Sequence, residues 1–286
     1  FRLGTRRSPL ALAQAEEARA RLAAAHGVSL AHIEIVPVIA SGDRIQDRAL
    51  AEIGGKALWT KELDAWLASG EIDFAVHSGK DVETIRPAAF AIGAILPRED
   101  VRDVLIGSAT VAELPHGAVV GTSAPRRAAQ LLHARPDCTV VTFRGNVASR
   151  LGKLAAGEVD ATFLALAGLN RLGQSDTGHP IPAEEWLPAP AQAAILIECR
   201  ADDAHTRDFL SAIDDAPSRA AVLAERALLL ALGGNCHSPI AVLTSQDERE
   251  ITMRAAIYSA DGTQRVEGQE TFASSDRDGP ARLAAD

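Results

Sequence analysis

Three short segments place arginines beside hydroxyl or amide residues where the sequence predicts that a strand ends and a helix begins. They are Thr5–Pro9, Gly121–Arg127 and Phe143–Asn146, the last followed by Arg150. Free N–H groups and the helix dipole favour an anion at such a turn, and arginine pairs with a carboxylate through two hydrogen bonds. Because an arginine opposes the dipole unless an anion lies between them, the repeated pattern predicts a polyanionic ligand in one cleft. For any single turn, a solvated arginine and a capping Ser or Asn explain the residues equally well.

A further segment, His77–Asp81, follows a predicted strand and brings a carboxylate next to an ammonium group. Asp81 is able to exchange a proton or stabilise a cation, and Lys80 offers another anion site. The alternative is a surface ion pair in a turn, and the residues themselves do not decide between the two. His77 is predicted to be a packed histidine that faces back into the sheet.

The chain has 3 cysteines, and their spacing gives neither a disulfide framework nor a metal-binding CxxC motif. No metal site is expected. Cys138 and Cys199 lie in apolar, strand-like runs and are predicted to be inert core residues. Cys236 lies in the loop Gly233–Pro239, where a cysteine serves as a nucleophile, as an attachment point or in no chemical role.

Other basic residues give weaker signals. Arg171 is predicted near a helix C-terminus, where a cation is electrostatically ordinary. Lys56 lies in a polar stretch between Ser41 and Leu58 that lacks clear periodicity, and Lys61 follows it. A long loop of this kind is often a lid or is disordered, and disorder is the simpler expectation.

Composition limits the possible functions. A chain of 286 residues with 47% hydrophobic residues has room for roughly two or three ordinary domains. The net charge of −9 and the 4% aromatic content argue against a nucleic-acid surface, which needs a basic face and stacking side chains. No apolar run has the length of a membrane span, and no signal peptide is recognisable, so a cytoplasmic protein is expected.

Predicted strands and helices alternate through the first two thirds of the chain, which is typical of α/β domains with mainly parallel sheets. Two such sets are expected, with prolines between Pro180 and Pro190 marking the connection after the second set. A returning strand is predicted at Ala194–Cys199, followed by a helix at Ser218–Leu232. Antiparallel strands and a helix that begins near Asp276 complete a small α+β unit.

Taken together, these motifs resemble those of the porphobilinogen deaminase (hydroxymethylbilane synthase) family over nearly the whole chain. The resemblance is carried by order and spacing, because each string is short: Thr5–Leu10, Gly54–Lys56, Lys61–Glu62, His77–Val82, Gly121–Ser123, Arg126–Arg127, Arg144–Val147, Gly168–Leu169, Arg171–Gly173, Ile197–Arg200, Ala224–Ala227 and the Cys236 loop. It implies two α/β domains similar to the halves of a periplasmic binding protein and a small α+β C-terminal domain. The implied limits are residues 1–97 with 191–212, 98–190, and 213–286.

The resemblance also implies a transferase of tetrapyrrole (haem) biosynthesis that joins four porphobilinogen molecules head to tail, with loss of ammonia, into hydroxymethylbilane. The pyrroles carry acetate and propionate arms. The implied cofactor is a dipyrromethane held through a thioether to Cys236, and a monomer without nucleic-acid or membrane partners is expected. Asp81 would be the catalytic carboxylate that stabilises a positive pyrrole nitrogen. The implied cofactor-binding residues are Cys236, Lys80, Ser78, Thr122, Ser123, Arg126 and Arg127, and the implied substrate-binding residues are Arg6, Ser8, Arg144, Arg150, Arg171 and Lys56.

The sequence departs from the family pattern at a few positions. Ala124–Pro125 replaces a hydroxyl residue and an aliphatic one, which predicts one hydrogen bond fewer to the cofactor. Ala191 and Ala193 stand where glycines are usual, so a backbone with positive φ there would be strained. Gly79 replaces a larger residue, and Asn235 replaces a glycine.

Two other functions compete with this reading. A non-catalytic, two-lobed binding protein for an oxyanion or dicarboxylate would explain the arginine turns, but it gives Asp81 and the Cys236 domain no role. A thiol enzyme would use Cys236 as its nucleophile, but the sequence offers no plausible base partner.

Overall fold

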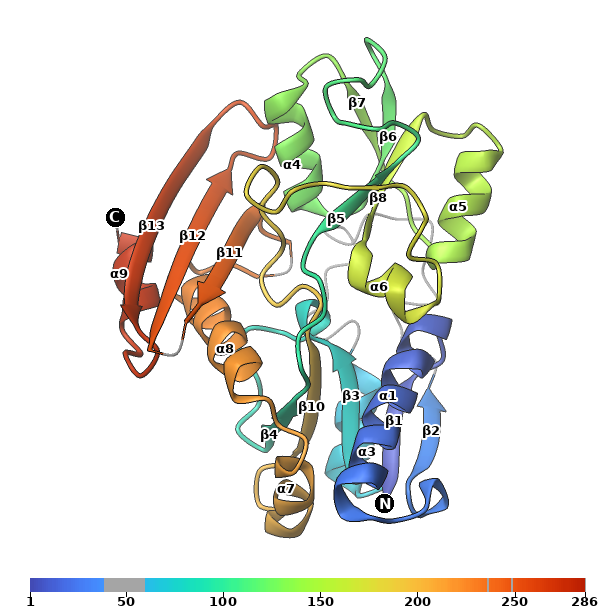
Figure 1. Cartoon of the computed structure of the whole chain (residues 1–286), viewed down its shortest axis with the longest axis vertical. Coiled ribbons are helices and arrows are strands. Elements are labelled where there is room, and N and C mark those ends of the chain that lie inside the picture. Colours follow the sequence, from blue (N-terminus) through green and yellow to red (C-terminus); the bar gives the residue numbers. More distant parts are fainter. Residues whose placement is uncertain (39–59, 236, 248, 286) are drawn as a thin grey trace.

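The computed structural model describes residues 1–38, 60–235, 237–247 and 249–285, which form three sheets with their helices (Figure 1). The first sheet has the strand order β2-β1-β3-β10-β4. Its first three strands are parallel, whereas β10 runs antiparallel to both of its neighbours. The strands are β1 (Arg2–Arg6), β2 (Glu34–Val38), β3 (Phe74–Ser78), β4 (Phe90–Ile95) and β10 (Ile195–Arg200).

Helices α1 (Pro9–His26), α3 (Lys61–Ser69) and α7 (Ala204–Ser211) pack on this sheet. Helix α1 begins where the sequence predicts, because the Ser8 side chain accepts a hydrogen bond from the Ala11 amide and Pro9 occupies the first turn. Leu3, Phe74 and Ile197 are fully buried in the core beneath α1. A short 3₁₀ turn, η1 (Leu30–His32), precedes β2, and a second one, η2 (Gly79–Asp81), follows β3.

The second sheet repeats this plan with the order β7-β6-β8-β5-β9. Strands β7, β6 and β8 are parallel, and β5 runs antiparallel to β8 and β9. Phe163 stacks on Trp186 in its core, with ring centroids 5.0 Å apart. The elements are β5 (Asp103–Ile106), β6 (Val119–Gly121), α4 (Pro125–Ala134), β7 (Thr139–Val141), α5 (Val147–Ala155), β8 (Ala161–Ala165), α6 (Leu166–Arg171) and β9 (His179–Pro180).

The third unit is a three-stranded antiparallel sheet, β11-β12-β13, which packs with α8 and α9. Figure 1 shows it beside both larger sheets, with α8 next to the lower one. Its elements are α8 (Ala216–Ala231), β11 (Ile240–Gln246), β12 (Glu250–Tyr258), β13 (Arg265–Ala273) and α9 (Gly279–Ala285). The predicted fold class, two α/β units and a small α+β unit, is confirmed.

The chain passes between the two larger sheets twice, once from β4 to β5 and once from β9 to β10. These crossings bring a late strand, β10, into the centre of the first sheet. The carboxyl ends of the parallel strands in both sheets are followed by the arginine-rich turns that the sequence singled out.

Some elements differ from expectation. Strands β4 and β5 were not predicted, because short apolar runs cannot be assigned to a strand by periodicity alone. The last helix begins at Gly279 and not near Asp276, because the Asp276 carboxylate accepts the Asp278 amide in a turn that precedes it.

Candidate active site

A cleft of about 1630 Å³ is bounded by both α/β sheets, by the connection before β10 and by the third unit. The turns after β1 and β3 supply one wall, and the segments after β6, β7 and β8 supply another. This convergence at the carboxyl ends of strands is the arrangement that the arginine turns predicted. The site residues on its surface are Arg6, Ser8, Ser78, Lys80, Asp81, Ser123, Arg126, Arg127, Arg144 and Arg150.

On the first wall, Arg6 and Asp81 approach each other from the ends of β1 and β3. The Arg6 guanidinium lies 3.5 Å from Asp81 Oδ2, and the two side chains are 19% and 30% exposed. Ser78 exchanges hydrogen bonds of 3.0 and 3.1 Å with Gln14 of α1, so its hydroxyl is held at the cleft. Burial and then the charge of Arg127 lower the pKa of Lys80 to about 8.

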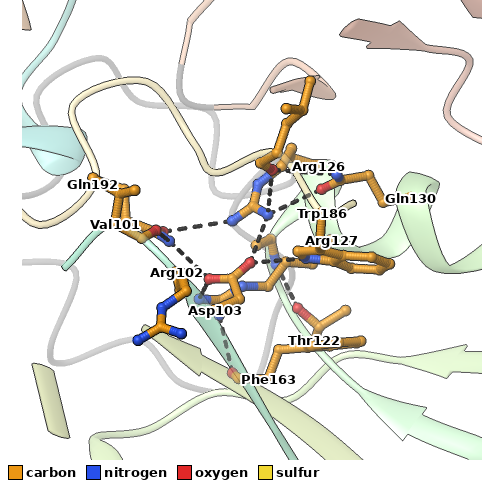
Figure 2. A network of polar contacts seen from close by, with 12 residues as sticks. Val101, Arg102, Asp103, Thr122, Arg126, Arg127, Gln130, Phe163, Trp186 and Gln192 are labelled. Carbon is orange, nitrogen blue, oxygen red and sulfur yellow. Dashed lines mark hydrogen bonds and ion pairs between the residues drawn. The ribbon is translucent and has the colours of Figure 1, made fainter. Parts of the chain in front are cut away.

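On the second wall, Arg126 and Arg127 of α4 converge on one buried carboxylate, that of Asp103 in β5 (Figure 2). Arg126 Nη1 donates to Oδ2 over 2.6 Å and Arg127 Nη2 to Oδ1 over 2.7 Å. Trp186 and Gln192 donate to the same carboxylate over 3.0 and 2.8 Å. One negative charge therefore faces two buried positive charges.

The turn after β7 carries Arg144 and Arg150. Gly145 has φ +120°, which favours glycine, and the Asn146 side chain caps α5 by accepting the Ser149 amide. Arg150 donates through Nε to the Gly145 carbonyl over 3.0 Å. Burial, followed by the charges of Arg127 and Arg144, lowers the pKa of Arg150 to about 10. Positive charges are thus crowded on this side of the cleft.

Two of the predicted site residues lie away from the cleft surface. Arg171 donates to Glu17 of α1 over 3.2 Å and to the Ala193 carbonyl over 3.1 Å. Thr122 is buried, and its hydroxyl accepts the Ala124 amide over 3.2 Å, which shapes the turn. Lys56 and Cys236 lie outside the described residues, as does the whole predicted loop between Ser41 and Leu58.

The Ala124–Pro125 turn begins helix α4 without a side-chain cap. Ala124 occupies the N-cap position of α4 without a side-chain hydrogen bond, and Pro125 takes the first turn. The adjacent Ser123 hydroxyl accepts the Phe143 amide over 3.0 Å, so it links the turns after β6 and β7.

The third unit reaches the cleft through the end of α8 and the following loop. Asn235 and His237, the neighbours of Cys236 in sequence, both line the cleft. The predicted inert cysteines are confirmed as buried, and burial raises the pKa of the Cys199 thiol to about 11. His77 is also buried, as predicted, and burial together with Arg86 lowers its pKa to about 4, so the ring is neutral near pH 7.

Ala191 and Ala193 have positive φ, at 57° and 70°. This is the backbone conformation that makes glycine favourable at both positions. Ala191 also packs against Gly79, where an added Cβ would lie 3.2 Å from the Ala191 Cβ and 3.0 Å from its carbonyl oxygen. The two departures from the family pattern are therefore in contact.

Sequence reasoning missed three residues that organise the cleft: Asp103, Gln192 and Arg226. Nothing near Asp103 in the sequence distinguishes it from a surface carboxylate, because its partners come from α4 and from the connection before β10. Arg226 lies in the Ala224–Ala227 string that contributed to the resemblance, but its target was not predictable.

Two negative findings apply to the described residues. Their His, Cys, Asp and Glu side chains form no group of three or more that could hold a metal ion. Among the helices within those residues, none combines the length and apolar character needed to cross a membrane.

Residues 1–208 match the family model described as the porphobilinogen deaminase, dipyromethane cofactor binding domain, and residues 219–283 match that of the porphobilinogen deaminase C-terminal domain. A porphobilinogen deaminase of Sphingopyxis alaskensis is 59% identical, over 94% of this chain and 87% of that protein. The enzyme of Paracoccus denitrificans is 48% identical, over 96% and 89%. A chloroplastic porphobilinogen deaminase of Oryza sativa is also 48% identical, over 95% and 77%.

Among solved structures, a periplasmic substrate-binding protein of an ABC transporter from Coxiella burnetii has a TM-score of 0.45 and 15% identity, over 79% of this chain and 96% of that one. The two family models together cover most of the sequence, and the relatives match over nearly its full length. The chain therefore belongs to the porphobilinogen deaminase family.

Proposed function

We propose that this protein is a hydroxymethylbilane synthase, a transferase that condenses four porphobilinogen molecules into the linear tetrapyrrole of haem biosynthesis. Family membership and relatives of this name across bacteria and plants support the assignment. The structural observation that best supports the assignment is the excess of positive charge in the cleft. Lys80, Arg126, Arg127 and Arg150 all line it, and burial, followed by the charge of Arg127, lowers the pKa of Lys80 and of Arg150.

Crowded, partly desolvated cations favour a ligand that brings its own carboxylates. The acetate and propionate arms of each pyrrole meet this requirement. Arg6, Ser8, Arg144 and Arg150 are proposed to bind these arms on the incoming substrate and the growing chain. Arg171 is proposed to support this side of the cleft through the Ala193 carbonyl.

The dipyrromethane cofactor is proposed to be held by the other group of cations. Arg126 and Arg127 line the cleft, and the buried Nε of each has no hydrogen-bond partner within the described part of the chain. These donors, with Lys80, Ser78 and Ser123, suit the carboxylates of a pyrrole, and Thr122 shapes the same turn. When bound, the cofactor supplies the pyrrole end onto which the substrates are added.

The anchor for the cofactor is proposed to be a thioether to Cys236. The two residues beside it in sequence line the cleft, and the other cysteines, Cys138 and Cys199, are buried in the cores. A thiol enzyme is less well supported, because the sequence offers Cys236 no plausible base partner, and His77 is buried in the first sheet with a pKa lowered to about 4, which makes it a weak base.

Asp81 is proposed as the catalytic carboxylate. Loss of ammonia from an aminomethylpyrrole leaves a delocalised cation, and a fixed carboxylate near the pyrrole nitrogen lowers the energy of that charge. Asp81 is partly exposed to the cleft, which leaves it accessible to such a cation. The acetate and propionate arms would be held by the surrounding arginines while the ring nitrogen faces Asp81.

We also propose the three domain limits given above, namely residues 1–97 with 191–212, 98–190 and 213–286. The grouping of strands supports them, because β10 returns to the first sheet and α8 packs with β11.

The experiment is to measure the intact mass of the purified protein and its consumption of porphobilinogen, for the wild type and for Cys236→Ala. We expect the wild type to exceed its sequence mass by one dipyrromethane and to release a tetrapyrrole, and the variant to show the bare sequence mass. Cys138→Ala is the matched control and should keep the added mass. An unmodified wild type that binds porphobilinogen without consuming it would instead identify a binding protein.

A further inference from the structure

Helix α8 of the third unit forms hydrogen bonds with the segment that follows Asp81. Arg226 is 9% exposed, and its guanidinium donates to three consecutive backbone carbonyls. The distances are 3.1 Å to Val82, 2.5 Å to Glu83 and 3.3 Å to Thr84. These residues follow Asp81 directly, so Arg226 fixes the backbone on one side of the catalytic carboxylate.

The preceding residue of α8 acts on the other side of Asp81. Glu225 is fully buried, pairs with Arg98 over 2.6 and 2.9 Å, and accepts the Ala191 amide over 2.7 Å. Ala191 packs on Gly79, two residues before Asp81. The Gly79 amide donates to the carbonyl of Ala194 over 2.8 Å. Adjacent residues of one helix therefore hold both flanks of Asp81.

The same helix leads into the loop of the third unit that borders the cleft. Thr84 donates to the Gly234 carbonyl over 3.5 Å, which joins the Asp81 segment to this loop. Gly234 is packed closely, since an added Cβ would lie 2.6 Å from Ile240 and 2.7 Å from Leu229 of α8. The loop, the helix and the Asp81 segment thus form one connected unit.

We infer that Arg226 is a positioning residue that holds the Asp81 carboxylate in place relative to the loop of the third unit. The inference rests on the proposed function. The Asp81 side chain has one ion-pair contact within the described residues, the 3.5 Å approach of Arg6, so its position depends mainly on its backbone. A displacement of about 1 Å costs up to about 100-fold in rate when a catalytic group must meet a reacting centre.

The test compares Arg226→Lys and Arg226→Gln with Arg219→Gln. Arg219 is a matched control, because it also projects from α8 and donates to two carbonyls of the first sheet, those of Ile92 and Gly93, over 3.3 and 3.2 Å. Those carbonyls lie in β4 and do not border the cleft. Porphobilinogen turnover is measured per cofactor-loaded molecule, with loading determined from the intact mass and unfolding temperatures recorded in parallel.

We expect both Arg226 variants to retain the cofactor mass and to lose about 10-fold to 100-fold in kcat, with KM changed less than about 3-fold. Lysine keeps the charge but reaches fewer of the carbonyls, so its loss should be the smaller one. Arg219→Gln should stay within about 2-fold of the wild-type kcat even where its unfolding temperature falls.

A second measurement separates positioning from simple destabilisation. Asp81→Glu moves the carboxylate by one methylene, and its penalty should be smaller in the Arg226→Lys background than in the wild type, because a loosened turn adjusts to the longer side chain. Additive penalties, or Arg226 variants with wild-type kcat per loaded molecule, would overturn the inference. A wild type that does not consume porphobilinogen would instead refute the proposed function.

Discussion

Asp103, the first residue of β5, and Asp81, in the turn after β3, both pair with arginine, yet their surroundings differ. Asp103 is fully buried and accepts four hydrogen bonds of 2.6 to 3.0 Å from Arg126, Arg127, Gln192 and Trp186. Asp81 is 30% exposed and lies 3.5 Å from Arg6. The Asp103 carboxylate is therefore occupied by protein donors, whereas the Asp81 carboxylate is accessible to a ligand. Residue type and pairing with arginine are alike, so burial and the number of donors distinguish the structural carboxylate of Asp103 from the ligand-accessible carboxylate of Asp81.

The electrostatics follow the same division. Although burial alone would raise it, the charges of Arg126 and Arg127 hold the pKa of Asp103 far below its usual range. Asp103 therefore stays ionised and keeps the two guanidinium groups in place at the cleft. One carboxylate balances only one of the two arginines, which leaves a positive charge for an anionic ligand.

The largest expected effect is on stability, for Asp103→Asn. The amide keeps the shape but leaves two buried guanidinium groups without a counter-charge, which should cost about 3–5 kcal/mol in the free energy of unfolding. Urea unfolding of the variant tests this. Asp100→Asn is the control, because Asp100 pairs with Arg102 at 2.8 Å on the surface and should lose at most about 1 kcal/mol. Equal losses would remove the proposed contrast between buried and exposed pairs.

Asp81→Ala should have the opposite effect, with a large loss of turnover and little loss of stability. Turnover of porphobilinogen should fall by about 100-fold to 1,000-fold, because a fixed charge that stabilises the cationic intermediate is lost. Stability should change little, since the side chain is partly exposed and its ion pair with Arg6 is long, at 3.5 Å. Steady-state kinetics with a parallel urea titration test both expectations. Normal turnover by the variant would remove Asp81 from the mechanism.

The difference between the two aspartates also shows what the sequence can predict. The placement of Asp81 at the cleft was predictable, because Ser78 and Lys80 lie close to it in sequence and the segment follows a recognisable strand. Asp103 was not, because its donors come from α4 and from the connection before β10, which only the folded chain brings together.

The fold shows the same limit. Helix α4 begins within the turn Gly121–Arg127, where the sequence predicts a helix start, and Pro125 occupies its first turn. Strands β4 and β5 were missed because a short apolar run acquires its identity from the strand beside it. Arg171 donates to Glu17 and to the Ala193 carbonyl, and the sequence did not predict either partner. Tertiary contacts determine where such a side chain points, so its partners cannot be predicted from local sequence.

A third prediction concerns the place where the two aspartate regions meet. Gly79 leads to Asp81, and Ala191 is followed by Gln192, which donates to Asp103. A Cβ at Gly79 would lie 2.7 Å from Leu196 and 3.2 Å from the Ala191 Cβ. Gly79→Ala should therefore cost about 1–3 kcal/mol in unfolding free energy and slow turnover by shifting Asp81.

Ala191→Gly should rescue part of this loss, because it removes the opposing methyl group and relaxes a residue with φ 57°. The double-mutant cycle should show a favourable coupling of at least about 0.5 kcal/mol. Gly152→Ala in α5 is the control, since an added Cβ there meets nothing within 4 Å and should be neutral or stabilising. A coupling of zero would mean that the two turns relax independently.

The smallest effect is a pH dependence of stability due to Lys80. Its ammonium group lies near Arg127, one of the two arginines that share the single charge of Asp103. Burial and Arg127 lower its pKa from 10.5 to about 8 in the folded protein. Between these two values the unfolded chain binds more protons than the folded one, so stability should rise with pH across that window. The measurement is urea unfolding of Cys236→Ala from pH 7 to about 10, with and without Lys80→Met, which should flatten the rise. A polycarboxylate pyrrole in the cleft would favour the ammonium form of Lys80, so adding porphobilinogen should reduce the rise of stability with pH. A rise that persists in Lys80→Met would place the titration on another residue.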